Sequence, residues 1–214
     1  MMPTNAYLQL QAEIIDHRPI IISGPSGVGR GTLIQRLTDS HPEFSQVVSQ
    51  TTRQPRIGES EGDPYYFVTE PVFTNIVENP GFIEYSSLNG NYYGTSKEAI
   101  ADQTRKGSAI LEIDTEGAKQ IKRSQCLDVR CVFIKPPDIH ALEARLRACG
   151  TEDKANMRGR LARASAEIDF AEKSGVYDLI ITNDDLDEAY RKLEAFVLGQ
   201  NVGFKVVYDP YQLD

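Results

Sequence analysis

Positive charge is in short supply in this sequence of 214 residues. Lys and Arg together number 23 against 31 Asp and Glu, which gives a net charge of −8 at pH 7. A general nucleic-acid binder, or a protein that docks on an anionic membrane through a polybasic face, needs positive charge spread over one surface. The composition therefore predicts no nucleic-acid partner and no membrane partner. It leaves small anions open, because these need only a few well-placed cations.

Long apolar runs are missing as well. No uncharged apolar run approaches the roughly 18 residues that a membrane-spanning helix needs. Residues 1–17 contain Glu13 and Asp16 and no basic segment leading into an apolar one, so they predict neither a signal peptide nor an Arg-rich transit peptide. The 3 cysteines, Cys126, Cys131 and Cys149, lack metal-ligand spacing and suit a reducing compartment. These features favour a cytoplasmic protein.

The chain nevertheless has enough apolar residues, 40%, to build a globular core. Short continuous apolar runs, typical of strands buried on both faces of a parallel sheet, alternate with segments of helical period. The runs are 20–22, 109–113, 129–134 and 179–181, and the helical segments are 31–39, 115–123, 138–148 and 185–198. This alternation predicts an α/β fold with a parallel sheet flanked by helices.

Two zones interrupt the alternation. Residues 45–95 hold several glycines and turn residues, and they predict a small mixed β insert with strands at 47–50, 65–68, 82–87 and 92–95 and a helix at 71–78. Residues 136–173 run through a break at Cys149 into a long helix rich in Ala and Arg. The acidic residues 184–188 are expected to cap a helix start rather than bind a metal.

A glycine loop follows the first apolar run. Gly24 and Gly29 are separated by four residues, which is P-loop spacing, and a strand-to-helix context surrounds them. Glycines allow backbone N–H groups to converge on phosphate oxygens at a helix N-terminus. The alternative is an ordinary glycine-rich turn. We expect phosphate contacts along the whole loop, at Gly24, Ser26, Gly27, Val28, Gly29, Arg30, Gly31 and Thr32.

An arginine pair and a carboxylate point to a second pocket. Arg53 and Arg56 lie three residues apart around Pro55, which disfavours a helix, and a curled loop would let both guanidinium groups bind one dianion. The alternative is two solvated surface arginines. Glu84 ends an apolar strand and, if buried, needs a partner such as the paired N–H donors of guanine. The residues alone do not identify that base.

Together these motifs resemble the guanylate kinase family over residues 18–198. The resemblance is carried, in order, by residues 24–29, 51–56, 90–95, 111–114 and 183–187. It implies an N-terminal extension 1–17, a P-loop kinase core of 18–44, 96–135 and 174–198, a GMP-binding insert 45–95, a helical lid region 136–173 and a C-terminal tail 199–214. It also implies ATP and GMP as substrates and Mg²⁺ arriving with ATP. For the oligomeric state, a monomer or a homodimer is expected, and the sequence does not choose between them.

The resemblance also assigns residues. Ser49, Glu84, Thr95 and Asp114 would hold guanine, with Glu112 beside the same pocket. Arg53, Arg56, Tyr65 and Tyr93 would hold the GMP phosphate, and Arg30, Arg145 and Arg160 would act on the transferring phosphoryl group. The acceptor oxygen of GMP is already anionic, so positioning and charge neutralisation suffice without a general base.

The sequence departs from the family at two positions on the ATP side. Arg30 stands in place of the P-loop lysine, and Cys149 stands where a further lid arginine is usual. These departures predict reduced activity, and they keep open a GMP-binding or protein-interaction module that has lost transfer. A monophosphate kinase for another base is a further alternative, which Glu84 and Ser49 disfavour.

The positive charge is unevenly distributed. Residues 135–163 contain seven basic and four acidic side chains, a local charge of +3, which leaves −11 for the rest of a chain whose total is −8. An acidic body with a cationic region over the phosphates suits a nucleotide enzyme.

Overall fold

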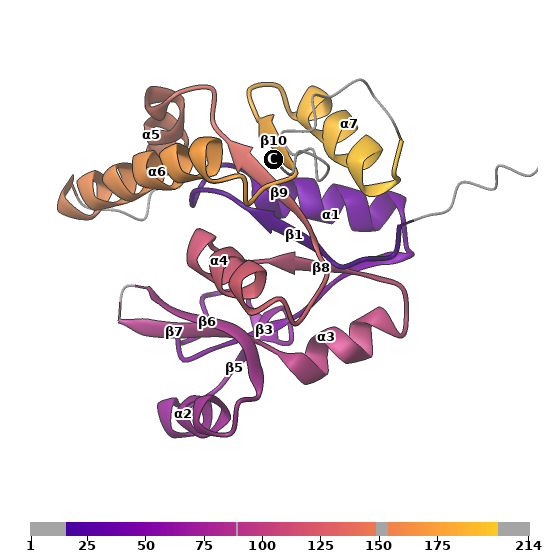
Figure 1. Ribbon diagram of the computed structural model, residues 1–214. Coiled ribbons are helices and arrows are strands. Elements are labelled where there is room, and N and C mark those ends of the chain that lie inside the picture. Colours follow the sequence, from indigo (N-terminus) through magenta and orange to yellow (C-terminus); the bar gives the residue numbers. More distant parts are fainter. Residues whose placement is uncertain (1–15, 89, 149–153, 201–214) are drawn as a thin grey trace, which may run out of the picture.

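The computed structural model describes residues 16–88, 90–148 and 154–200, and a parallel sheet lies at its centre (Figure 1). The strand order is β10-β9-β1-β8-β2, and every neighbouring pair is parallel. The strands are β1 (Ile20–Ser23), β2 (Phe44–Gln46), β8 (Ser108–Glu112), β9 (Arg130–Lys135) and β10 (Leu179–Thr182). The predicted α/β class with a parallel sheet is confirmed.

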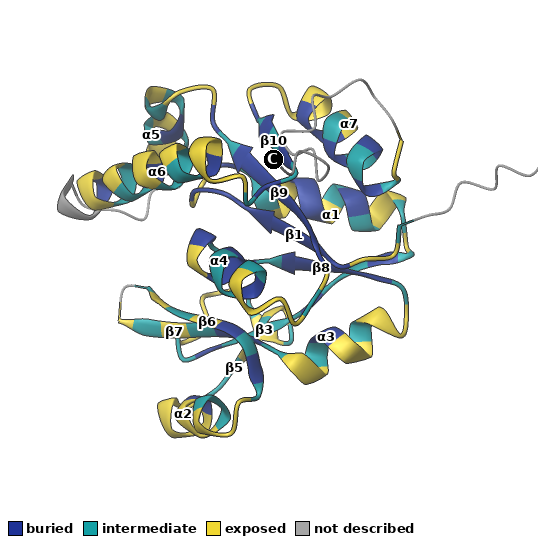
Figure 2. Ribbon diagram, in the orientation of Figure 1, coloured by how far each residue is buried: buried dark blue, intermediate teal, exposed yellow. Residues whose placement is uncertain are grey.

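The side chains of alternate strand residues pack into two separate hydrophobic cores, one on each face of the sheet. Ile20 and Ile22 point to the first core, whereas Ile21 points to the second, as the pleat requires. The helices of the first core are α1 (Arg30–Ser40), α5 (Ile139–Ala148) and α7 (Leu186–Val197), and those of the second are α3 (Lys97–Thr104) and α4 (Thr115–Ser124). Figure 2 shows the buried strands between these two layers.

Helix α6 (Lys154–Ser174) packs against both cores. Met157 and Ala164 belong to the first and Ala171 to the second. The helix therefore has apolar contacts with the molecule along its length.

A second sheet, with both parallel and antiparallel strand pairs, contributes lining residues to the cavity described below. Its order is β4-β5-β3-β7-β6, and β3 is parallel to β5 but antiparallel to β7. Its elements are β3 (Ser49–Thr51), β4 (Ser60–Glu61), β5 (Pro64–Phe67), β6 (Phe82–Leu88), β7 (Asn91–Ser96) and the helix α2 (Glu70–Glu78).

One expectation about this region is wrong in its bounds, and one helix was not expected. The strand expected at 47–50 begins only at Ser49, as β3 of the second sheet, while β2 of the central sheet ends at Gln46 and the buried Val47 lies between the two strands. Helix α3 was not expected at all. Its N-cap Ser96 accepts a hydrogen bond from the Ala99 N–H, and Ile100 is its buried residue.

The acidic segment at 184–188 caps a helix, as expected. Asp185 is the N-cap of α7, and its side chain accepts a hydrogen bond of 2.8 Å from the Glu188 N–H. Asp187 and Glu188 lie in the first turn, where negative charge is favoured by the helix dipole. None of the helices in the described ranges is long and apolar enough to span a membrane.

Candidate active site

The glycine loop joins β1 to α1 in the conformation that a phosphate site needs. Gly29 is the N-cap of α1 with φ 99°, and no side chain makes a capping hydrogen bond, so the first N–H groups of the helix are not occupied by a side-chain cap. Gly24 has φ 150°, and a Cβ there would lie 2.2 Å from the carbonyl oxygen of Ile134. Asn183 donates to the Val28 carbonyl at 2.8 Å and holds the loop against the end of β10.

Strand register brings four of the expected substrate residues into one row across the second sheet. Tyr65 of β5 lies opposite Ser49 of β3, and Thr95 of β7 lies opposite Glu84 of β6. The Ser49 and Thr95 hydroxyls are 2.9 Å apart, and the Thr95 hydroxyl donates to Glu84 Oε1 at 2.5 Å. The row therefore ends in a hydrogen-bonded chain from Ser49 to Glu84.

Glu84 is a buried carboxyl, only 4% exposed. Burial raises its pKa to about 7. The hydrogen bond from Thr95 opposes the rise in the pKa, whereas the negative charge of Asp114 adds to it. A ligand that brings N–H donors to this carboxyl would favour its ionised form.

The two arginines of the pair are held differently. The Arg53 fork binds both carboxylate oxygens of Glu59, at 2.9 and 3.0 Å, and the Arg56 N–H donates to the same carboxylate at 2.7 Å. The hydrogen bond from Arg53 holds the pKa of Glu59 below its usual range. Sequence reasoning missed Glu59. Its place three residues after Arg56, in the same turn, was the only signal.

The Tyr65 ring lies beside Arg53 and Tyr93. The Arg53 guanidinium carbon is 5.5 Å from the centre of the Tyr65 ring, and the rings of Tyr65 and Tyr93 are 5.7 Å apart in an edge-on arrangement. Burial raises the pKa of Tyr65, so its phenol stays protonated and can donate a hydrogen bond.

Arg30 points from the start of α1 toward the end of β8. It donates to the Ile113 carbonyl at 3.1 Å, and its Nε lies 3.5 Å from Glu112 Oε1. Glu112 therefore lies beside the arginine of the glycine loop. The Arg30 side chain is 18% exposed and lines the cavity described below, so a ligand there could contact it.

Asp114 is the N-cap of α4 and a junction between elements. Its Oδ1 accepts the Gly117 N–H at 2.9 Å, and its Oδ2 accepts from Ser86 at 3.2 Å and from Arg163 at 3.0 Å. Sequence reasoning missed Ser86 and Arg163 as site residues. Alternation from Glu84 along β6 could have found Ser86, and helical spacing from Arg160 could have found Arg163.

The two arginines expected to act on the transferring group lie in different places. Arg160 of α6 donates to the Ser26 hydroxyl of the glycine loop at 2.9 Å. Arg145 of α5 donates to the Asn183 carbonyl at 2.8 Å and is not among the residues that line the cavity described next. Cys149, the departure between them, lies outside the described residues.

A cavity of about 380 Å³ joins these groups, a size suited to a small-molecule ligand. It runs from the glycine loop to the second sheet. Its polar lining residues are Ser26, Arg30, Ser49, Arg53, Arg56, Glu59, Tyr65, Glu84, Ser86, Tyr93, Glu112, Asp114 and Arg160. Thr95 is fully buried behind this lining and contacts it through Ser49 and Glu84.

No cluster of three or more metal-ligating side chains occurs in the described part of the chain. Glu112 and Asp114 are the carboxylates nearest the end of β8, and Ser26 offers a hydroxyl in the same cavity. This oxygen-only set suits Mg²⁺, which keeps several waters and takes most of its other ligands from substrate phosphates.

Comparison with known proteins gives a consistent result. The family model described as guanylate kinase matches residues 16–200. The chain is 45% identical over 184 residues to "Guanylate kinase" of Schizosaccharomyces pombe, covering 85% of this chain and 91% of that protein. It is 42% identical over 181 residues to "Guanylate kinase" of Homo sapiens, covering 83% and 90%. A crystal structure of guanylate kinase from Anaplasma phagocytophilum superposes with a TM-score of 0.67 at 30% identity, over 85% of each chain.

Proposed function

Because the chain belongs to the guanylate kinase family, we propose that its cavity binds GMP and that ATP places its phosphates at the glycine-loop end of this cavity. The chain is an enzyme that transfers a phosphoryl group from ATP to GMP, giving ADP and GDP. The observation that carries the residue assignments is the single cavity that joins an arginine pair, a buried carboxyl and a glycine loop. A family relative that has lost transfer is not favoured, given the level of identity to guanylate kinases.

The base-binding end is Glu84 with its hydrogen-bonded row. The ionised carboxylate would accept the N1–H and N2–H₂ donors of guanine, and the Thr95 hydroxyl would keep donating to it. Ser49 and Asp114 would complete the edge of the pocket. A base that presents an acceptor in place of the N1–H donor would leave the carboxylate unpaired, which disfavours adenine.

The phosphate-binding end is the pair Arg53 and Arg56 with the phenols of Tyr65 and Tyr93. Glu59 now fills the Arg53 fork in the way that a dianion would. The GMP phosphate would either share the Arg53 guanidinium with Glu59 or replace Glu59 on it. In both cases Arg53 is already oriented when the substrate arrives. This lowers the entropic cost of fixing a long side chain.

Transfer needs alignment more than acid–base chemistry. The glycine loop and the first N–H groups of α1 would hold the donor phosphates, and Arg30 and Arg160 would neutralise charge on the transferring group. We propose the same for Arg145, which requires its guanidinium to leave the Asn183 carbonyl. Mg²⁺ bound with ATP would supply Lewis-acid charge neutralisation, and Glu112 is a carboxylate of the cavity that could hold it through water.

We further propose that the enzyme works in the cytoplasm as a monomer or a homodimer. The proposed compartment rests on the composition of the sequence and on its free cysteines, of which Cys126 is exposed and Cys131 is buried.

The test is ADP formation from ATP and Mg²⁺ by the purified chain, with and without GMP. We expect ADP formation to depend on GMP. ADP release at the same rate without GMP would contradict the function. Replacing Glu84 with alanine should weaken GMP binding far more than ATP binding, and equal loss of both would contradict the assignment of the base pocket.

A further inference from the structure

A second arginine on α6 contacts the base pocket one helical turn after Arg160. Arg163 donates through Nη2 to Asp114 Oδ2 at 3.0 Å and through Nε to Glu167 Oε1 at 2.8 Å. Arg160 and Arg163 are three residues apart, so they lie on the same side of the helix. Two adjacent turns of α6 therefore contact the glycine loop, at Ser26, and the base pocket, at Asp114.

Arg163 reaches Asp114 from outside the substrate cavity. A second cavity, of about 460 Å³, lies between β6, α4 and α6, and Arg163, Lys119 and Phe170 are among its lining residues. Asp114 and Ser86 line both cavities, whereas Arg163 lines only the second. The arginine thus supports Asp114 from behind and leaves the substrate cavity open for a base.

Asp114 is itself fixed to the body of the protein. Its other hydrogen bonds go to the Gly117 N–H of α4 and to Ser86 of β6. The ion pair with Arg163 is the contact that extends this rigid junction to α6. It is 39% exposed at the arginine and 20% exposed at the aspartate, so it is partly screened and can be broken without leaving a deeply buried charge.

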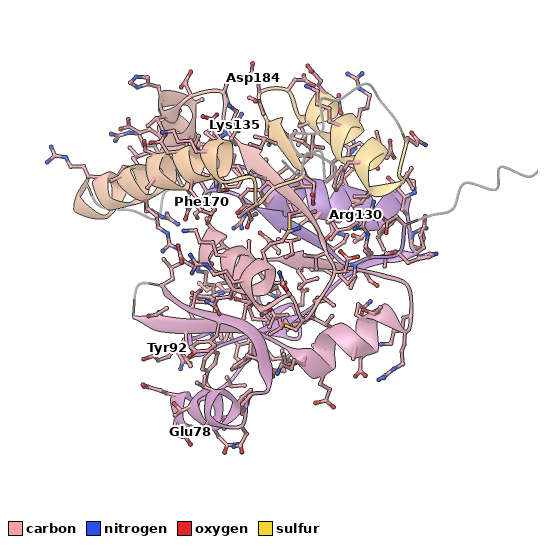
Figure 3. The ribbon with its side chains drawn as sticks, in the orientation of Figure 1. Glu78, Tyr92, Arg130, Lys135, Phe170 and Asp184 are labelled. Carbon is pink, nitrogen blue, oxygen red and sulfur yellow. The ribbon has the colours of Figure 1, made fainter. Side chains whose placement is uncertain are left out.

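Other contacts keep α6 folded when this pair is removed. Met157, Ala164 and Ala171 are buried in the two cores. The Lys119 ammonium lies 4.0 Å from the centre of the Phe170 ring, and Lys135 pairs with Glu172 at 2.6 Å. Figure 3 labels Phe170 on the side of α6 that faces α4. Loss of Arg163 should therefore shift or loosen the helix near Arg160 rather than unfold it.

We propose that Arg163 is a positioning residue that links Asp114 in the base pocket to the turn of α6 that carries Arg160 over the glycine loop. The proposal rests on the proposed function. Arg163 touches neither substrate, and its effect on transfer is exerted through the placement of Arg160. Because a displacement of about 1 Å at a reacting group can cost about 100-fold in rate, a partial loosening of α6 should cost about tenfold.

The experiment compares Arg163→Met with Arg158→Met, since Arg158 is an exposed arginine on the same helix. With GMP and ATP both saturating, kcat of Arg163→Met should fall about tenfold, and the Kd for GMP measured by calorimetry should change less than about threefold. Arg158→Met should match the wild type in both. Arg163→Lys, which can still reach Asp114 with one donor, should recover part of kcat.

A double-mutant cycle with Asp114→Asn tests the route of the effect. Asparagine keeps the N-cap of α4 but removes the charge that Arg163 meets. If Arg163 acts through Asp114, kcat of the double variant should equal that of the slower single variant. Multiplication of the two single effects, or a wild-type kcat for Arg163→Met, would overturn the proposal.

Amide hydrogen exchange on the ligand-free chain separates this proposal from the proposed function. Amides of α6 around Arg160 should exchange faster in Arg163→Met than in Arg158→Met, and equal exchange would overturn the link. If the wild-type chain made no GMP-dependent ADP, the proposed function would fail, while the exchange comparison would still decide whether Arg163 holds α6.

Discussion

Replacing Glu84 with glutamine tests the base pocket through the charge of one buried side chain. Glutamine has nearly the same shape and can still accept the Thr95 hydroxyl, so the row from Ser49 is kept. It cannot offer two acceptor oxygens to guanine, and its amide would face the N–H donors of the base. Charge-assisted hydrogen bonds contribute about 1.5–3 kcal/mol each, so GMP affinity should fall about 100-fold.

The raised pKa of Glu84 makes a second, more specific prediction about pH. With a pKa of about 7 in the free protein, the carboxyl is ionised in about one molecule in ten at pH 6 and in about nine in ten at pH 8. Because the ionised form binds guanine, the apparent Kd should fall about tenfold between these pH values. The Glu84→Gln variant should lose this dependence.

The same shift affects stability with a defined sign. The folded pKa of about 7 exceeds the ordinary value of 4.5. Between these pH values the folded protein holds a proton on Glu84 that the unfolded chain has lost. The stabilisation from Glu84 is therefore complete below about pH 4.5 and is lost as the pH rises through about 7. At about 1.36 kcal/mol per pKa unit, the free energy of unfolding of Glu84→Gln, relative to that of the wild type, should rise by about 3 kcal/mol between pH 4.5 and pH 8.

Calorimetry suits the binding measurement, because the chain contains no Trp to report binding by fluorescence. The GMP phosphate itself titrates near pH 6, so guanosine, which lacks it, serves as the control ligand. An affinity for guanosine that is flat from pH 6 to 8, or a Glu84→Gln variant that binds GMP within threefold of the wild type, would refute the reasoning.

Two further variants test other parts of the molecule. Arg30→Lys should raise kcat at least about tenfold, which corresponds to about 1.4 kcal/mol of the activation barrier. The reason is that a compact ammonium group would replace a guanidinium that is now held by Glu112 and the Ile113 carbonyl. Steady-state kinetics at saturating ATP measures this, and an unchanged kcat would show that arginine is tolerated. Arg130→Met should destabilise the fold by about 2–4 kcal/mol in urea unfolding, because the arginine, 7% exposed, donates to the Phe196 and Val197 carbonyls and to the Asp16 carbonyl. A loss below about 0.5 kcal/mol would contradict that role, and Arg158→Met is its surface control.

Four strands of the central sheet were predictable because they are continuous apolar runs bounded by polar loops, whereas β2, with the sequence Phe-Ser-Gln, is not such a run and was not expected. The run at 20–22 became β1, and the helix starts at Arg30 and Leu186 lie within one residue of the expected ones. The segment 44–51 was not predictable, because this short run of residues is divided between two sheets, with β2 ending at Gln46 and β3 beginning at Ser49. Only tertiary pairing with β8 on one side and with β5 and β7 on the other decides where it breaks.

In the candidate site, too, residues that belong to local sequence motifs could be predicted, whereas contacts between residues far apart in the sequence could not. The glycine loop and the arginine pair are sequence motifs, so their residues could be named before the fold was known. The register that places Glu84 opposite Thr95 is a property of the sheet. Sequence reasoning also missed two ion-pair partners, Glu59 for Arg53 in a turn and Arg163 for Asp114 on α6. Each of these contacts depends on where a turn or a helix is packed.

The most direct test of the account is a product analysis after the purified chain has been incubated with ATP, Mg²⁺ and GMP. We predict GDP and ADP in equal amounts, with no corresponding diphosphate when AMP replaces GMP, and strongly reduced GDP formation by Glu84→Gln under the same conditions. ADP without GDP, or equal phosphorylation of AMP and GMP, would contradict the central claim.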